Sequence, residues 1–194
     1  MKYFIVGMHS TGKMKVAKIL KENKISVGHL STNAELSQEL TTHNLYRKYD
    51  IEDMNSIFEN SAYIFFKDLN DRLMNEYECL TKFDFDNNDV FILSPHHINS
   101  IPKTDFNEEI CFIWLDNNVT NREMNHIDES RKYKFHERDR LESKDIHDFV
   151  DKIYTMPNSS MIYFWNEDPQ RVATIIEIMI RYPEMRRKII DNFN

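Results

Sequence analysis

Glycine is scarce in this sequence. Its 194 residues include three glycines, whereas average usage near 7% would give about fourteen. Two of the three, Gly7 and Gly12, lie close together near the start of the chain. A chain that otherwise avoids glycine but places two in one short segment is expected to need backbone freedom there. The segment between them is therefore the first candidate for a ligand-binding site.

Cysteine, long apolar segments and excess positive charge are also lacking. The two cysteines, Cys79 and Cys111, have no metal-ligand spacing, which argues against a disulfide framework or a zinc site. No apolar segment reaches the length of a membrane span, and residues 1–6 are too short for a secretory signal, so we expect a cytoplasmic protein without a membrane partner. The net charge of −7 argues against an extended nucleic-acid-binding surface and favours local recognition of phosphate.

The segment from Gly7 to Met14 has the pattern Gly-x-x-x-x-Gly-Lys. It follows the apolar run Tyr3–Val6 and precedes Val16–Leu20, whose apolar residues have helical spacing. This order is typical of a phosphate-binding P-loop, with an ordinary strand-to-helix turn as the alternative. In such a loop, backbone N–H groups and the helix N-terminus donate to phosphate oxygens, and the lysine adds positive charge. The residues expected around the phosphate are Gly7, Ser10, Thr11, Gly12, Lys13 and Met14.

Met14 departs from the usual pattern. The position after the P-loop lysine normally carries serine or threonine, whose hydroxyl helps to hold Mg²⁺. The thioether of Met14 cannot take that role. Because Mg²⁺ commonly keeps several waters and phosphate oxygens as ligands, we expect weaker metal placement rather than loss of phosphate chemistry.

The remainder of the chain alternates between apolar runs of strand length and amphipathic helices. Strands are predicted at residues 27–30, 90–93, 110–115 and 161–164, and helices at residues 51–58, 66–80, 146–153 and 172–180, with an acidic turn at residues 84–89. Alternating strands and helices after a P-loop predict a parallel, three-layer α/β fold. The length suggests one domain, residues 1–194, that can bury a substantial core.

Three further segments follow the P-loop in a recognisable order. They are Tyr46 with Met54, Asn60, Tyr63 and Ile64; Arg140-Leu141; and Phe164-Trp165-Asn166-Glu167-Asp168. Together with the P-loop, they resemble the guanylate kinase branch of the nucleoside monophosphate kinases. The resemblance covers most of the chain, although each segment except the P-loop is degenerate.

This resemblance implies a P-loop kinase fold with ATP as the phosphate donor, Mg²⁺ as the metal ion and a nucleoside monophosphate as the acceptor. A helical acceptor-binding insertion would span about residues 31–82, and an arginine-bearing lid about residues 120–142. The assigned residues are Lys13, Arg131 and Arg140 (or Arg138) for catalysis, Asn166 for the adenine of ATP, and Tyr46, Arg47, Phe65, Ser94 and His96 for the acceptor. Each has a plainer alternative, such as packing at the core edge, a solvated helix face or a helix cap.

The acceptor site departs from the family pattern. Residues 31–38 contain no arginine where the family has two for the acceptor phosphate, and Arg47 could supply that charge from a shifted position. Phe65 stands where the family has a glutamate that pairs with guanine, and the acids expected after the third strand align near Ser94 and His96. We therefore expect poor use of ordinary GMP. The preferred acceptor would be a guanylate-like purine deoxynucleotide with a modified base, of the kind phages make for DNA modification.

Two other functions stay open. A kinase-like module that binds a nucleotide or a protein partner without catalysis would account for Met14 and the lost acceptor arginines. A kinase acting on a hydroxymethylated base or another non-nucleotide acceptor is the third hypothesis. The sequence also leaves a homodimer open.

Overall fold

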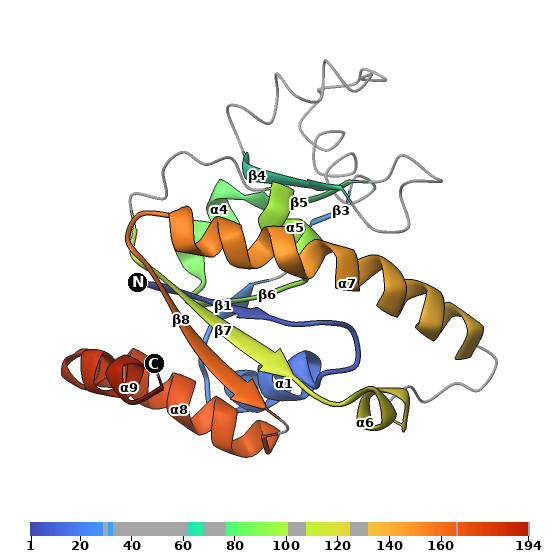
Figure 1. Ribbon diagram of the computed structural model, residues 1–194. Helices are drawn as coiled ribbons and strands as arrows, with labels where there is room; N and C mark the ends of the chain where they lie inside the picture. The colour runs from blue at the N-terminus through green and yellow to red at the C-terminus, as the bar shows by residue number, and fades with distance from the viewer. Residues whose placement is uncertain are drawn as a thin grey trace.

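The computed structural model places the helices and strands of this chain around a parallel sheet (Figure 1). It describes residues 1–28, 31–32, 62–67, 77–100, 108–124, 132–165 and 167–193. In several of these segments the description covers the backbone alone.

Within the described ranges, five strands form one sheet in the order β2-β6-β1-β7-β8, and all neighbouring strands are parallel. The strands are β1 (Lys2–Val6), β2 (Val27–Gly28), β6 (Val90–Leu93), β7 (Ile110–Asp116) and β8 (Ser159–Trp165). Every residue of the central strand β1 is buried, as expected for an apolar strand covered on both faces. The strands predicted at residues 90–93, 110–115 and 161–164 are confirmed. Of the strand predicted at residues 27–30, the described residues Val27–Gly28 form β2.

Helices cover both faces of this sheet (Figure 1). One face carries α1 (Lys13–Glu22), α8 (Pro169–Arg181) and α9 (Arg186–Phe193), and the other carries α4 (Lys82–Asn87), α5 (Pro95–Ser100) and α7 (Lys132–Thr155). Side chains of β1 alternate between the two resulting cores, with Tyr3 and Ile5 in one and Phe4 and Val6 in the other. The α/β class and the parallel sheet are therefore confirmed.

The predicted helix over residues 66–80 is wrong. Its two ends lie in the strands β4 (Ala62–Lys67) and β5 (Tyr77–Thr81), which pair antiparallel, with β3 (Ser31–Thr32) on the other side of β5. Residues 68–76 lie outside the described residues. The run Ala-Tyr-Ile-Phe-Phe in β4 is aromatic and β-branched, a composition that favours strands over the helical spacing seen farther along. The described part of the expected helical insertion is thus a small antiparallel sheet. The helix predicted at residues 51–58 lies outside the described residues.

The acidic turn predicted at residues 84–89 is also wrong over most of its length, because α4 continues to Asn87. Phe85 on this helix is buried and stacks on Phe91 of β6, with ring centroids 5.8 Å apart. The Nζ atom of Lys2 donates to the carbonyl oxygens of Asp86 and Asn88 at the end of the helix, at 3.4 and 2.9 Å. Packing and a lysine at the C-terminal carbonyls therefore stabilise a short helix in an acidic sequence.

Helix α7 is longer than the sequence predicts. The expected apolar face is confirmed, since Phe149 and Ile153 are buried and Ile146 and Val150 pack beside them. The helix begins at Lys132, however, so Arg140-Leu141 lies inside it and not ahead of it. The described part of the expected lid consists of α6 (Val119–Met124) and the first half of α7.

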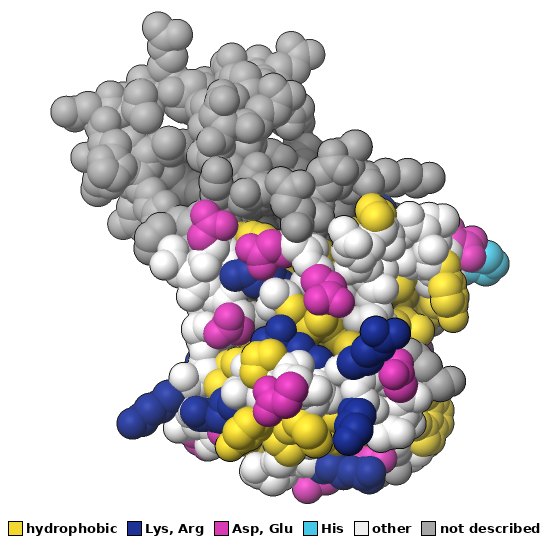
Figure 2. Space-filling view, turned by 90° about the vertical axis from the view of Figure 1, so that its left-hand side faces the viewer, with side chains coloured by type: hydrophobic (Ala, Val, Ile, Leu, Met, Phe, Trp, Pro, Cys, Tyr) yellow, Lys and Arg dark blue, Asp and Glu magenta, His cyan; other side chains and the backbone are white. Residues whose placement is uncertain are grey.

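The described surface carries charges of both signs. Figure 2 views the molecule from the end opposite to the loop after β1, and lysine, arginine and acidic side chains are interspersed there among hydrophobic ones. Among the helices that the structure describes, none is long and apolar enough to cross a membrane.

Candidate phosphate-binding site

The end of β1 lies at a topological switch point of the sheet. From β1 the chain passes through α1 to β2 at one edge, whereas from β7 it passes through α6 and α7 to β8 at the other (Figure 1). Connections therefore leave the neighbouring strands β1 and β7 in opposite directions. In open parallel sheets, ligands bind at the C-terminal ends of the strands at such a point. The loop of residues 7–12 lies there.

The two glycines of this loop are needed for different reasons. A Cβ atom on Gly7 would lie 2.2 Å from the carbonyl oxygen of Leu115 in β7, which is closer than atoms can approach. Gly12 has a φ of 97°, in the left-handed region that favours glycine, although a Cβ there would have room beside Pro169. Gly7 therefore allows the loop to pack on β7, and Gly12 lets the chain turn into α1.

Lys13, the first residue of α1, folds back across the loop. Its buried Nζ donates to the carbonyl oxygens of Gly7 and Met8, and Thr11 Oγ1 donates to the Met8 oxygen over 2.8 Å. The ammonium group thus lies beside the N-terminus of α1, which carries a partial positive charge. Together they favour an anion such as phosphate at this loop.

A hollow of about 360 Å³ lies beside the loop on the β6 side. It is lined by His9, Ser10, Gly12, Lys13, Met14, Lys15, Ile92 and Ser94. Its volume falls within the range of small-molecule pockets. The structure therefore brings Ser94, expected at the acceptor, next to Ser10, Lys13 and Met14 of the loop.

His96 is placed differently from Ser94. It is buried near the start of α5, and the centroid of its ring lies 3.9 Å from that of the His97 ring. The Nδ1 atom of His97 accepts a hydrogen bond from the Ser94 N–H over 2.9 Å and so holds the end of β6 in place. Of this pair and Ser94, only Ser94 is among the described residues lining the hollow.

Met14 is 71% exposed at the mouth of the hollow. A thioether is a soft ligand, whereas Mg²⁺ takes oxygen ligands. Over the ranges that the structure describes, no group of three histidine, cysteine or acidic side chains could hold a metal ion. These residues do not fit a magnesium ion bound by the protein at the loop, and phosphate oxygens and water would have to supply its ligands.

A second, much smaller hollow of about 10 Å³ lies on the other side of the loop, which is room for about one water molecule. It is lined by Thr11, Val16, Leu115, Asp116, Asn117, Phe164, Glu167, Pro169 and Val172. Asn166, expected near adenine, lies outside the described residues, but its neighbour Glu167 reaches this hollow. The end of β8 therefore adjoins the loop, and the role of Asn166 at adenine stays a prediction.

Two exposed aromatic residues stand at this end of β8. Tyr163 and Trp165 are 44% and 53% exposed, and their spacing places them on the same face of the strand. The Tyr163 hydroxyl donates to Asp116 Oδ2 over 3.1 Å. Three effects raise the pKa of Tyr163 to about 12: first its partial burial, then the negative charge of Asp116 and the hydrogen bond to it.

Helix α7 contacts the loop through a carboxylate that the sequence analysis missed. Glu142 is fully buried, and its Oε2 accepts from the His9 N–H over 2.6 Å and lies 3.0 Å from His9 Nδ1. The His9 ring also packs edge-on against Phe135 of α7, with centroids 4.5 Å apart. No periodicity marks Glu142 in the sequence, because it lies within a strongly charged segment.

Arg122 of α6 packs against the same part of α7. It is 4% exposed, pairs through Nη1 with Asp139 of α7, and donates from Nε to the Asn117 carbonyl oxygen over 3.2 Å. Its guanidinium carbon lies 5.8 Å from the centre of the Phe135 ring. The sequence contains this arginine in the expected lid region, but the resemblance gave it no role.

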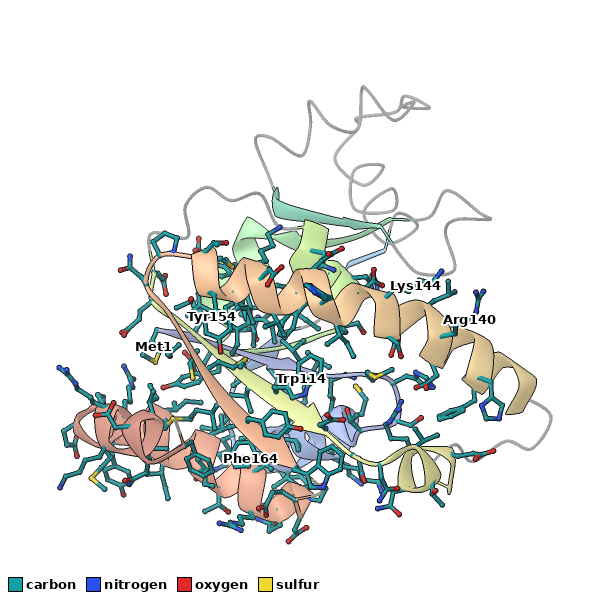
Figure 3. The ribbon with its side chains drawn as sticks, viewed as in Figure 1. Met1, Trp114, Arg140, Lys144, Tyr154 and Phe164 are labelled. Atoms are coloured by element: carbon teal, nitrogen blue, oxygen red, sulfur yellow. The ribbon has the colours of Figure 1, made fainter. Side chains whose placement is uncertain are left out.

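Arg140 lies on another side of α7. It is exposed, and Figure 3 shows it pointing away from the sheet. Two positions separate it from Glu142, a turn of about 200° around a helix. The side of α7 that meets the loop therefore carries Asp139 and Glu142, and Arg140 would need a different position of the helix to reach a ligand there.

The other expected acceptor and lid residues are described in part or not at all. Tyr46, Arg47 and Arg131 lie outside the described residues, as does the side chain of Arg138. The backbone of Phe65 lies in β4 opposite Cys79 of β5. Their predicted roles stay predictions.

No protein-family model matches this chain, and a search of curated proteins finds no match. Any assignment of function therefore depends on the loop and its surroundings.

Proposed function

We propose that this protein is a P-loop phosphotransferase of the guanylate-kinase-like type, which transfers a phosphoryl group from ATP to a nucleoside monophosphate. The observation that carries the proposal is the buried Lys13 folded across a glycine-bounded loop at the switch point of a parallel sheet. That loop also has a hollow on the β6 side, where a second ligand could meet the phosphate.

The chain's own part in such a reaction is to position the reactants and to neutralise charge. The N–H groups at the start of α1 and the Lys13 ammonium would hold the donor phosphates, and Lys13 would release its loop carbonyls to do so. Ser94 at the end of β6 would face the acceptor across the hollow. The thioether of Met14 and the other side chains lining the hollow do not fit a metal ion bound by the protein. We therefore derive no step that depends on one.

The proposed acceptor is a purine deoxynucleotide with a modified base. This part depends on the resemblance, which aligns Phe65 with a glutamate that pairs with guanine. Without that carboxylate, the N1–H and amino groups of guanine would lack an acceptor, which costs roughly 1–3 kcal/mol and about ten- to a hundredfold in specificity. Ordinary GMP is then a poor substrate. Another acid, such as Asp68, could replace the lost carboxylate.

A coupled assay with ATP across a panel of monophosphates tests the proposal. Product formation should depend on Lys13, so that Lys13→Ala abolishes transfer, whereas Lys18→Ala on the same helix leaves it unchanged because Lys18 is 79% exposed. Comparing kcat/KM for GMP, dGMP and base-modified deoxyguanylates, in wild type and Phe65→Glu, tests the acceptor. Equal use of GMP and the other acceptors would contradict the specificity argument, and wild-type turnover in folded Lys13→Ala would contradict the mechanism.

A second candidate is a module that binds a nucleotide without transferring phosphate. The exposed thioether of Met14 favours it, as does the carboxylate of Glu142, which α7 turns toward the loop. Tight, Lys13-dependent nucleotide binding with no phosphorylated product from any acceptor would identify this function. Product from a hydroxymethylated or non-nucleotide acceptor, with none from free monophosphates, would instead identify the third hypothesis.

A further inference from the structure

The contact between Glu142 and His9 joins α7 to the middle of the phosphate-binding loop. One carboxylate oxygen meets both the backbone N–H of His9, at 2.6 Å, and its Nδ1, at 3.0 Å. With the carboxylate ionised, it can only accept, so Nδ1 carries the hydrogen and the ring orientation is fixed. Phe135 closes the third side of the ring. His9 is thus held by its backbone, its imidazole nitrogen and its ring edge.

Packing alone does not explain why a carboxylate, Glu142, is buried at this position. Burying a charge is unfavourable unless it is hydrogen-bonded, and an apolar side chain of similar size would pack at lower cost. What the carboxylate adds is direction, because it holds one N–H group of a loop whose other N–H groups must converge on a ligand. Displacing a positioning group by about 1 Å can cost about a hundredfold in rate.

We propose that Glu142 is a positioning residue, which acts through His9 to hold the phosphate-binding loop in its binding shape and to fix α7 against it. The inference deepens the proposed function and rests on it. It fixes the position of α7 relative to the loop, with Asp139 and Glu142 on the side of the helix that faces the loop and Arg140 pointing away from the sheet. Movement of α7 would then be coupled to the shape of the loop through the contacts of Glu142 and Phe135 with His9.

The charge of Glu142 and its geometry should act in opposite directions. Its negative charge repels a bound phosphate, whereas its hydrogen bonds hold the loop ready for one. Glu142→Gln removes the charge and keeps an oxygen for the His9 N–H, whereas Glu142→Ala removes both. Glu142→Asp keeps the charge but withdraws the carboxylate from the loop. Asp139→Asn is the matched control, since it disrupts the ion pair with Arg122 on the same side of α7 and leaves the contact between Glu142 and His9 in place.

The experiment measures binding of ATP and of inorganic tripolyphosphate by calorimetry, with thermal unfolding and circular dichroism on each variant. We expect Glu142→Ala to weaken tripolyphosphate binding roughly ten- to a hundredfold, as for loss of hydrogen bonds to a charged group. Glu142→Asp should lose affinity in the same direction. Glu142→Gln should bind as tightly as wild type or more tightly, and Asp139→Asn should lower the unfolding temperature while its Kd stays within about threefold of wild type.

Three outcomes would overturn the inference. Wild-type affinity in folded Glu142→Ala or Glu142→Asp would show that the contact does not position the loop. Equal weakening by Asp139→Asn and Glu142→Ala would reduce Glu142 to general packing. Tighter binding in both Glu142→Gln and Glu142→Ala would mean that the carboxylate competes with phosphate. In each case Lys13-dependent binding by wild type leaves the proposed function standing, whereas absence of any phosphate binding by wild type overturns both.

Discussion

The two sides of the loop after β1 are built differently. On the side of β7 and α7 the loop is closed, with Gly7 against the Leu115 carbonyl oxygen and His9 held by the buried Glu142. On the side of β6 it faces a hollow of about 360 Å³, at whose mouth Met14 is exposed. One side of the loop is therefore anchored in the protein, and the other has room for a ligand.

This difference separates stability from binding. Substitutions on the closed side should disturb packing and the shape of the loop, because atoms there have no room to move. Substitutions on the open side should change binding or activity with little effect on stability. Substitutions on the two sides of the loop, and in the helices packed against it, test this division.

Gly7→Ala should be the most damaging change on the closed side. The added Cβ would lie 2.2 Å from the Leu115 carbonyl oxygen, so β1 and β7 would have to move apart. We expect a loss of about 3 kcal/mol in the free energy of unfolding, as for severe overpacking. For a chain of this length, that lowers the unfolding temperature by about 6–12 °C, which calorimetry would measure.

Gly12→Ala is the matched control for Gly7→Ala. Its Cβ would have room, with the nearest atom at 3.9 Å, so the cost arises from the positive φ alone and should be about 1–2 kcal/mol. An equal or larger loss of stability in Gly12→Ala would contradict the account of the closed side.

Arg122→Ala should have the next largest effect on stability. The substitution removes a nearly buried guanidinium from Asp139, from the Asn117 carbonyl oxygen and from the Phe135 ring. Because Asp139 is 20% exposed and keeps partial access to water, we expect a loss of about 2–3 kcal/mol rather than the full cost of a buried unpaired charge. Chemical denaturation would measure it.

Arg171→Ala provides the comparison, since the Arg171–Glu167 pair lies on the surface and Arg171 is 60% exposed. Its loss should be within about 0.5 kcal/mol. If the two variants lose equal stability, the Arg122 contacts do not hold α6 and α7 together.

Met14→Ser should have the smallest effect and should act on function alone. The side chain is 71% exposed, so the free energy of unfolding should change by less than about 0.5 kcal/mol. The new hydroxyl could take part in holding Mg²⁺, and nucleotide turnover should rise at limiting Mg²⁺ while staying near wild type at saturating Mg²⁺. Unchanged dependence on Mg²⁺ would show that this position does not meet the metal ion.

The sequence predicts the sheet and the loop because both depend on local signals. Four-residue apolar runs such as Val90–Leu93 indicate buried strands. The pattern of Gly7, Gly12 and Lys13 lies within seven consecutive residues, so the sequence shows it directly. The strands β4 and β5 were missed since apolar spacings of three and four residues are ambiguous in short segments. Antiparallel pairing of β4 with β5 determines that these segments are strands, and a local sequence pattern does not show which segments pair.

The surroundings of the loop were harder to predict for the same reason. Glu142 lies 133 positions from its partner His9, and Arg122 lies 17 positions from its partner Asp139. The packing of α7 brings each pair together. When most residues of a helix are charged, the sequence does not show which of the charged side chains are buried. The resemblance directed attention to Arg140, whereas burial identifies Arg122 and Glu142.

The central claim is that the loop after β1 binds the phosphates of a nucleotide through Lys13. Calorimetric titration of ATP into wild type, Lys13→Ala and Lys18→Ala tests it most directly, with thermal unfolding measured alongside because Lys13 also holds the Gly7 and Met8 carbonyl oxygens. We predict that wild type and Lys18→Ala bind ATP with equal affinity, whereas folded Lys13→Ala binds roughly ten- to a hundredfold more weakly. Equal affinity in all three proteins, or no binding by wild type, would contradict the claim.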